Sequence, residues 1–193
     1  MFRVAPGRVS AAVAAACTAL VLGAAASSAA TSYPNDPFFT QGDQWALAGA
    51  TSSINAPQAW CASTGAGIVI ADIDTGADFN HPDLSGKLIG GARFTDGTGN
   101  QSAGGVQDDN GHGTMTTGIM VADTNNNTGI AAVAPDARAL VVKVLNSGGG
   151  GYDNDVSAGI EWAWQNGANV INLSLGPDIP FTSSITVNSG IPN

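Results

Sequence analysis

Three apolar runs alternate with two helical patterns along this chain, and this alternation constrains the fold more than any other feature. The runs cover residues 67–73, 137–145 and 170–174. Continuous apolar runs of this length are typical of strands buried on both faces of a parallel sheet. The helical patterns lie between them, at 113–122 and 153–167. Strands and helices in this order favour right-handed crossovers, so we predict an α/β fold with a doubly wound, mostly parallel sheet.

The spacing of small and apolar residues predicts which face of each helix is buried. In the first helix this face is Met115, Gly118, Ile119 and Ala122, and in the second it is Val156, Ile160, Ala163 and Trp164. Asp153, Asn154 and Asp155 offer side-chain oxygens for the N-cap of the second helix, and Gly167 is suited to end it.

The first 30 residues have the pattern of a secretory signal peptide. Arg3 and Arg8 form a short basic region, and an alanine-rich apolar run over residues 11–26 follows. The run is short for a membrane span and leads to Ser28-Ala29-Ala30, a cleavage site of small residues. We therefore predict that residues 1–30 are removed and that the protein is secreted, with a retained membrane anchor as the alternative.

The chain that remains after this cleavage is strongly acidic. All fifteen acidic side chains lie beyond residue 30, against four basic ones, which gives this part a net charge of −11. Such a charge argues against nucleic acid or an anionic membrane surface as a partner, and it is compatible with cation binding. Cys61 is the single cysteine left, so no disulfide within the chain is expected.

Polar and glycine-rich segments divide the rest of the chain. Residues 31–52 are predicted to form an irregular N-terminal arm, which Phe38, Phe39, Trp45 and Leu47 could pin to a core. A short helix is expected within 55–61, a long surface loop over 95–111 and a second polar loop over 123–128.

Asp74 and His112 are the first candidates for chemistry. Asp74 follows the first predicted strand, and His112 opens the first long helix, so both should emerge at the carboxyl edge of the sheet. There a carboxylate could hold Nδ1–H of the imidazole and fix its tautomer. The helix dipole should disfavour the protonated ring, which suits a general base. The alternatives are an Asx turn at Asp74 and a simple turn histidine.

Five ordered segments containing these residues resemble the subtilases, the subtilisin-like serine peptidases. They are 74–76 (Asp-Thr-Gly) with 81–84 (His-Pro-Asp-Leu), 112–114 (His-Gly-Thr) with Gly118, 129–135 (Gly-Ile-Ala-Ala-Val-Ala-Pro), 142–145 (Val-Lys-Val-Leu), and 170–176 (Val-Ile-Asn-Leu-Ser-Leu-Gly). The resemblance implies a subtilisin-like fold and makes residues 53–193 part of a peptidase domain. It implies that Asp74 is the orienting aspartate and His112 the general base, in the Asp, His, Ser chain order known from subtilisin.

The resemblance also implies where a polypeptide substrate and a metal ion would bind. Ser174, Leu175 and Gly176 correspond to one substrate-binding strand, with Leu175 near the specificity pocket, and Gly148, Gly149 and Gly150 to the opposite strand. A peptide would pair with both backbones; a flexible linker is the alternative reading of the glycines, and Tyr152 could form a pocket wall. Structural Ca2+ is expected at Asp83, Asn125 and Asn127, since hard oxygen donors suit this ion; a plain polar turn is the alternative.

Several positions depart from the subtilase pattern. Asp72 stands where an apolar strand residue is usual, so it needs a partner or a proton if it is buried. Met115, Thr116 and Thr117 replace His-Val-Ala, and no room for a propeptide is seen after residue 30. The oxyanion asparagine and the Gly-Thr-Ser nucleophile of the family do not occur.

None of Ser183, Ser184 and Ser189 has the sequence context of the family's nucleophile. We therefore expect a C-terminally truncated domain that is inactive on its own, because covalent attack and stabilisation of the oxyanion are both lost. The alternative is a secreted module that binds calcium or peptide without catalysis. An accidental resemblance of an acidic surface protein is the third possibility.

Overall fold

The computed structural model describes residues 33–49 and 52–177, so the predicted signal peptide and the three candidate serines lie outside the described residues. Four strands form one sheet: β1 (Val69–Asp74), β2 (Leu88–Arg93), β3 (Arg138–Lys143) and β4 (Val170–Asn172). Their order is β2-β3-β1-β4, and every pairing is parallel. The predicted α/β fold with a parallel sheet is confirmed.

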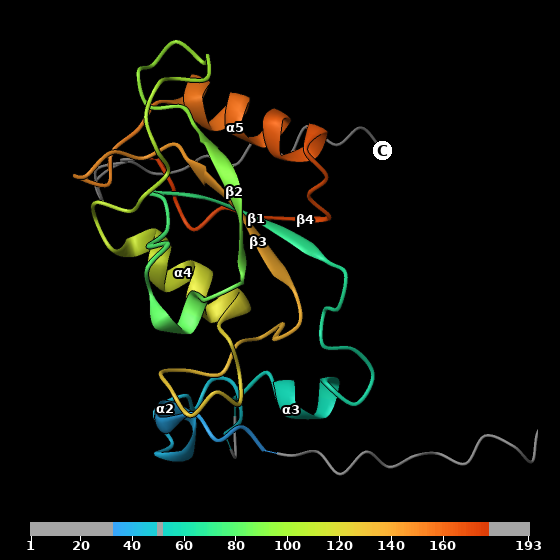
Figure 1. Ribbon diagram of the computed structural model, residues 1–193. Helices are drawn as coiled ribbons and strands as arrows, with labels where there is room; N and C mark the ends of the chain where they lie inside the picture. The colour runs from blue at the N-terminus through green and yellow to red at the C-terminus, as the bar shows by residue number, and fades with distance from the viewer. Residues whose placement is uncertain (1–32, 50–51, 178–193) are drawn as a thin grey trace, which may run out of the picture. The chain divides into compact units, whose positions relative to one another are not determined.

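Two long helices cover opposite faces of this sheet (Figure 1). They are α4 (His112–Val121) and α5 (Asp153–Gln165); the short helices are α2 (Pro37–Thr40), α3 (Ala56–Ala59) and the 3-10 turn η1 (Pro82–Leu84). On the α5 side, Ile73 packs in a cluster with Ala163. On the α4 side, Ile70 packs with Val121. Because side chains alternate along a strand, Asp72 and Asp74 share the α4 side with Ile70.

Strand β2 was not predicted, because Gly90 and Gly91 interrupt its apolar pattern. The structure gives a reason for the second glycine. A Cβ atom at Gly91 would overlap the carbonyl oxygen of Val141 on the neighbouring strand β3. Glycine therefore allows β2 and β3 to approach closely, and the same residue hides the strand from sequence reasoning.

The predicted buried face of α4 is partly wrong. Gly118 and Ala122 are buried, but Met115 is 63% exposed and Ile119 is 55% exposed. The face against the sheet instead includes Gly113 and Thr117. Small residues are required here because a Cβ atom at Gly113 would overlap the carbonyl oxygen of Gly76. The close contact with the end of β1 therefore determines which face of α4 is buried, and the spacing of apolar residues does not.

The predictions for α5 also need correction. Its N-cap is Tyr152, which makes no side-chain capping bond, and Asp155 is buried. The Asp155 carboxylate accepts hydrogen bonds from the backbone N–H groups of Gly97 (2.8 Å) and Gly99 (3.1 Å), so it anchors the 95–111 loop. Trp164 is 70% exposed, whereas Ala163 beside it is buried.

The N-terminal region packs against the rest of the domain through a small apolar cluster. Leu47, Ala56 and Ala131 are its buried members, and Phe39 and Trp60 pack against them. Of the four side chains predicted to pin this region, Phe38 and Trp45 are exposed. The region is less irregular than expected, since it contains helix α2. Within the described residues, exposed Cys61 forms no disulfide, and no helix is long and apolar enough to span a membrane.

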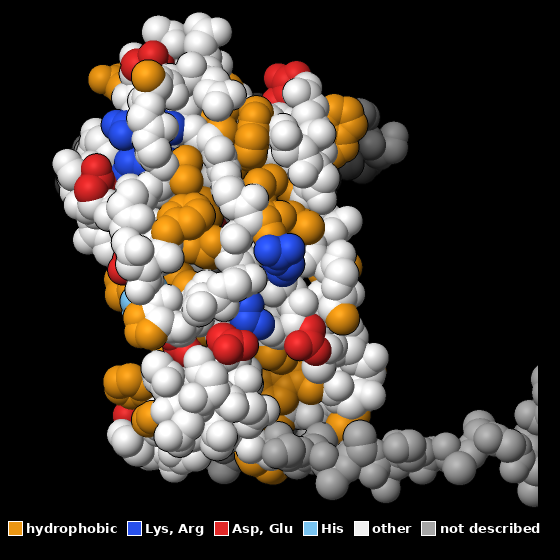
Figure 2. Space-filling model, in the orientation of Figure 1, with side chains coloured by type: hydrophobic (Ala, Val, Ile, Leu, Met, Phe, Trp, Pro, Cys, Tyr) orange, Lys and Arg blue, Asp and Glu red, His pale blue; other side chains and the backbone are white. Residues whose placement is uncertain are grey.

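Strand β4 lies at one edge of the sheet, and apolar side chains close to it are exposed. Val170 and Leu173 both face solvent there. Hydrophobic side chains also reach the surface on the face shown in Figure 2, among scattered acidic and basic side chains. Exposed apolar edge strands favour association between chains.

Candidate active site

Asp74 and His112 meet at the carboxyl edge of the sheet. Asp74 is the last residue of β1 and is fully buried, whereas His112 is the first residue of α4 and its side chain is 43% exposed. Nδ1 of the imidazole lies 2.8 Å from both carboxylate oxygens of Asp74. The backbone N–H of Thr75 donates to the same carboxylate at 2.6 Å. A buried, oriented carboxylate therefore holds one nitrogen of a ring that solvent can reach.

The carboxylate at Asp74 also sets the charge preference of the ring. The pKa of His112 is raised above its ordinary value of 6.5, chiefly by the hydrogen bond to Asp74, while partial burial lowers it. The charges of Asp74, Asp72 and Asp108 raise it further. The effect expected of the helix dipole, which disfavours the protonated ring, therefore does not set the direction of the net shift. A direct bond to a carboxylate outweighs the partial charge of a helix terminus.

Asp108 organises the loop in front of His112, and sequence reasoning missed it. Its carboxylate accepts hydrogen bonds from the Thr75 hydroxyl (2.8 Å), the Thr114 hydroxyl (2.6 Å) and the backbone N–H groups of Asn110, Gly111 and Thr114. Partial burial acts to raise the pKa of Asp108, but these hydrogen bonds outweigh it and hold the pKa well below the usual range. The Asp-Asp-Asn-Gly run before His112 was the signal available for it.

Lys143 lies fully buried beneath the same loop. Its Nζ donates to the carbonyl oxygen of Thr75 and to Oδ1 of Asp109, the latter at 2.7 Å. In the sequence this lysine interrupts an apolar run and belongs to the Val-Lys-Val-Leu segment of the subtilase resemblance, which assigned it no role. In the structure, a buried cation beside Asp109 fixes the segment that follows Asp74, as a paired buried charge requires.

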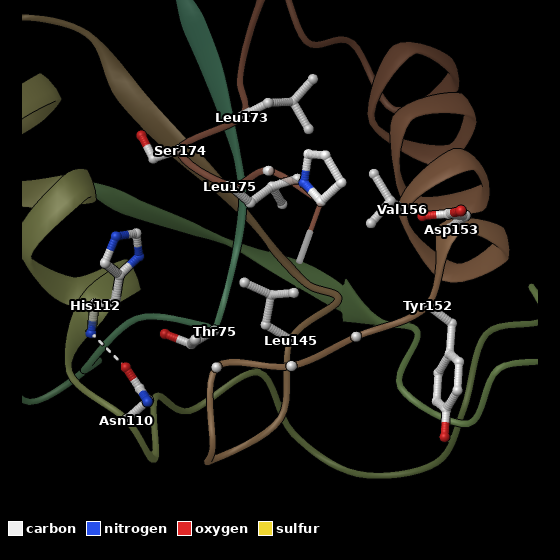
Figure 3. Close-up of a pocket in the computed structure, with 15 residues that line it drawn as sticks. Thr75, Asn110, His112, Leu145, Tyr152, Asp153, Val156, Leu173, Ser174 and Leu175 are labelled. Carbon is white, nitrogen blue, oxygen red and sulfur yellow. Dashed lines mark hydrogen bonds between the residues drawn. The ribbon is translucent and has the colours of Figure 1, made fainter. Parts of the chain in front are cut away.

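A cleft of about 720 Å³ opens beside the imidazole (Figure 3). Gly149, Gly150, Ser174, Leu175 and Gly176 line it, so five of the six predicted substrate residues come together there with His112. Gly148 is not in the lining, and Gly151 is. Tyr152 is also part of the lining, as are residues that were not predicted: Thr75, Asn110, Leu145, Asp153, Val156, Leu173 and Pro177.

The residues predicted for calcium lie in a second region, near η1. Asp83 is buried, and its carboxylate accepts from the Asn126 side-chain amide (2.8 Å) and the backbone N–H of Ile130 (2.9 Å). The other two predicted ligands contact the N-terminal region instead. Oδ1 of Asn125 accepts from the backbone N–H of Asn35, and the backbone N–H of Asn127 donates to Oδ1 of Asn35. The structure thus brings Asp83 to Asn126.

A second buried carboxylate, missed by sequence reasoning, contacts the same loop. Asp36 is fully buried and accepts from the backbone N–H groups of Asn125 (2.9 Å) and Asn126 (3.4 Å). Neither Asp36 nor Asp83 forms a salt bridge with a described residue. Two buried carboxylates without a basic partner, joined through one asparagine, form an oxygen-rich set that fits a hard cation. Among the described residues no group of three or more His, Cys, Asp or Glu side chains gathers for a metal.

Comparisons with known proteins identify relatives of this chain. A sequence model described as the subtilase family matches residues 65–191. The chain is 48% identical over 143 residues to thermitase of Thermoactinomyces vulgaris, an alignment that covers 74% of this chain and 48% of thermitase. It is 42% identical over 151 residues to the thermophilic serine proteinase of Bacillus sp. (strain AK1), covering 78% and 35% of the two chains.

A solved structure of proteases from Pseudoalteromonas arctica PAMC 21717 also matches. The TM-score is 0.66 at 32% sequence identity, and the match covers 75% of this chain and 51% of that one. The chain spans about half the length of these relatives, or less.

Proposed function

This chain belongs to the subtilase family, and from that premise we propose that it carries the acid–base and substrate-binding part of a serine endopeptidase site. The observation that supports this most is the contact of Nδ1 of His112 with the buried Asp74 carboxylate, at 2.8 Å, beside an open cleft. A carboxylate in this position orients the ring and stabilises the imidazolium when it forms.

The proposed chemistry assigns one role to each nitrogen of His112. Asp74 engages Nδ1, which leaves Nε2 to accept a proton from a serine hydroxyl and later to donate it to the leaving amine. The raised pKa of His112, caused first by the Asp74 hydrogen bond, makes the ring a stronger base than a free imidazole. Asp108 and Lys143 hold the loops around this pair but make no contact with the ring nitrogens.

A polypeptide substrate would bind in the cleft as an added strand. The backbone over 149–151 lies on one side and residues 174–176 on the other, and both line the cleft. Glycine at 149, 150 and 151 leaves the backbone accessible to an approaching peptide. The apolar side chains of Leu145, Val156 and Leu175 in the lining favour an apolar substrate side chain between them.

We propose that the 193 residues alone do not hydrolyse peptides. The sequence lacks the Gly-Thr-Ser context of the family's nucleophile. Without covalent attack and without the oxyanion donor, the chain can bind a peptide, but His112 has no serine hydroxyl to deprotonate. In the whole protein the nucleophile would complete the site, and the activity would be serine endopeptidase.

The test is hydrolysis of casein and of a chromogenic peptide by the purified chain, with His112→Ala as the matched control. We expect no turnover above this control. Turnover that a serine-directed fluorophosphonate blocks, and that His112→Ala abolishes, would refute the proposed inactivity. Mass spectrometry of the fluorophosphonate-treated chain detects a reactive serine even where turnover is slow, and we expect no adduct.

A second candidate function is peptide binding without catalysis, which the two-sided cleft favours. Calorimetric titration with a peptide carrying an apolar side chain would detect it. Saturable binding that the bulky substitution Gly150→Val weakens supports this candidate. Binding that the substitution leaves unchanged counts against use of the cleft.

The remaining proposals concern location and metal. Residues 1–30 are proposed to direct secretion, and N-terminal sequencing of the exported protein should begin at Thr31. Ca2+ is proposed as a structural ion held by the carboxylates of Asp36 and Asp83 and the side-chain oxygen of Asn126, after its amide turns. The ion would tie the N-terminal region to the loop over 123–128 and would take no part in proton transfer.

A further inference from the structure

A second carboxylate lies buried under the active site. Asp72 is 1% exposed, two residues before Asp74 and on the same side of β1. Its Oδ2 accepts hydrogen bonds from the hydroxyls of Thr117 (2.6 Å) and Thr116 (2.9 Å), and its Oδ1 accepts from the side-chain amide of Asn172 (2.9 Å). The Asn172 amide can only donate, and the two threonine hydroxyls lie at hydrogen-bond distance from the same carboxylate.

These hydrogen bonds join three elements that carry the site. Thr116 and Thr117 belong to α4, the helix that begins with His112. Asn172 ends β4 and also donates to the hydroxyl of Ser174 at 2.9 Å, so Asp72 is linked to the strand that lines the cleft. One carboxylate thereby fixes the general-base helix and the substrate strand to the strand that bears Asp74.

Three of the four residues involved, Asp72, Thr116 and Thr117, are positions that depart from the subtilase pattern, and the fourth, Asn172, keeps it. An apolar side chain is usual at position 72 and Val-Ala at positions 116 and 117, and here the departures meet in one hydrogen-bonded cluster. Apolar packing would hold the same elements together without placing a charge in the interior. The cluster therefore adds something that apolar packing does not, namely a buried carboxylate hydrogen-bonded to the helix that begins with His112.

We propose that Asp72 is a positioning residue of the active site, which fixes the His112 helix and the Ser174 strand and acts as a second buried carboxylate toward the imidazole. This inference rests on the proposed role of His112 as the general base. Asp74 contacts the ring directly, whereas Asp72 acts through the helix and through its charge.

The charged groups around the ring and the carboxylate can all be named. Asp74 on β1 contacts the ring, and the charges of Asp74, of Asp72 on the same strand and of Asp108 in the preceding loop all raise its pKa. Lys143 on β3 is paired with Asp109. Burial raises the pKa of Asp72, the hydrogen bonds from Thr117, Asn172 and Thr116 oppose this, and the charge of Asp74 adds to the rise.

The test is an NMR titration of the imidazole signals in the 193-residue chain, which contains only His81 and His112. In Asp72→Asn, which keeps the shape of the side chain, we expect the pKa of His112 to fall by about 0.5 unit. His81 serves as an internal reference and should not move. Asp123→Asn, which removes one exposed charge beyond the far end of α4, is the matched control and should leave His112 unchanged.

A second variant keeps the test decisive where Asp72→Asn does not fold. Asp72→Val combined with Thr116→Val and Thr117→Ala restores the apolar pattern of the family and removes the carboxylate together with its two hydroxyl partners. We expect this variant to fold and to lower the pKa of His112 by a similar amount. An unchanged His112 titration in a folded variant of either kind overturns the proposal, because Asp72 would then be a packing residue only. Neither titration requires peptide hydrolysis, so an inactive chain does not affect the outcome.

Discussion

Nδ1 of His112 lies within 2.8 Å of the Asp74 carboxylate, although the two residues are 38 positions apart in the sequence. Strand β1 ends at Asp74 and helix α4 begins at His112, so the sheet edge brings the two side chains together. The relationship is asymmetric, since the carboxylate is buried and the ring is accessible. This asymmetry lets the protein hold one nitrogen while the other meets the cleft.

This pair should make the free energy of unfolding depend on pH. Because the pKa of His112 is raised in the folded chain, first by the Asp74 hydrogen bond, its stabilising contribution is fully present below the unfolded value of 6.5. The contribution is lost as the pH rises through the folded pKa. In urea unfolding of the wild type, His112 should therefore add to the free energy of unfolding at pH 5.5 relative to pH 9. In His112→Gln this difference should shrink, and an identical pH profile in the variant would contradict the linkage.

Asp108 is predicted to stabilise the loop before His112 in its ionised form only. Its folded pKa is lowered by hydrogen bonds from Gly111, Thr114 and Asn110 that outweigh burial, so the stabilisation is present above pH 3.8 and declines as the pH falls further. Asp108→Asn should cost about 1–2 kcal/mol at pH 7, allowing for solvent exposure. Asp43→Asn, at an exposed carboxylate outside the site, is the control and should be neutral within about 0.5 kcal/mol. Equal stability of both variants by urea unfolding would rule out this role of Asp108.

Gly113 is predicted to be required by close packing of α4 on the end of β1. A Cβ atom there would overlap the carbonyl oxygen of Gly76, so Gly113→Ala should destabilise the fold by more than about 2 kcal/mol. Gly118→Ala in the same helix is the matched control. The nearest atom there, Cδ1 of Ile130, would lie at 3.5 Å, and alanine is the better helix former, so this variant should be neutral or more stable. Thermal unfolding of the two variants measures the difference, and a tolerated alanine at position 113 would show that the contact can relax.

Removal of calcium should lower the melting temperature. At an ion concentration 100 times the dissociation constant, the linkage is worth about 2.7 kcal/mol, or several degrees in a domain of this size. EDTA should thus reduce the melting temperature of the wild type, and added Ca2+ should restore it. Asp83→Asn should remove the response to EDTA, whereas Asp43→Asn should keep it. A wild type that melts at the same temperature with and without EDTA would contradict a structural ion at Asp36 and Asp83.

The sequence predicted the sheet and its main helices because their apolar runs are long and regular. Strands β3 and β4 and helix α5 lie within the predicted segments, whereas β1 and α4 each extend one residue beyond them, to Asp74 and to His112. Strand β2 was not predicted. Its Gly91 allows a close approach to β3, and a glycine gives no apolar signal in the sequence. The buried face of α4 was misjudged for a related reason, since close packing and a buried carboxylate favour Gly113 and Thr117 there over Met115.

The candidate site was predictable where it follows a family pattern and hidden where it depends on partners far apart in sequence. Asp74 and His112 could be named from ordered motifs, and five of the six predicted substrate residues line the cleft. Asp36 could not be named, because exposed and buried aspartates look alike in a sequence, and for Asp108 the Asp-Asp-Asn-Gly run before His112 was the only signal. The partners of Asp72 lie 44, 45 and 100 positions away, so only the fold reveals them.

The central claim is that Asp74 holds His112 as a base of raised pKa, and an NMR titration of the two imidazoles tests it most directly. In the wild type we predict that His112 titrates above 6.5. In Asp74→Asn, the loss of the hydrogen bond and the charge should lower the His112 midpoint by about 1 unit or more, with His81 unchanged. A His112 midpoint at or below 6.5 in the wild type, or one that Asp74→Asn leaves in place, would contradict the account.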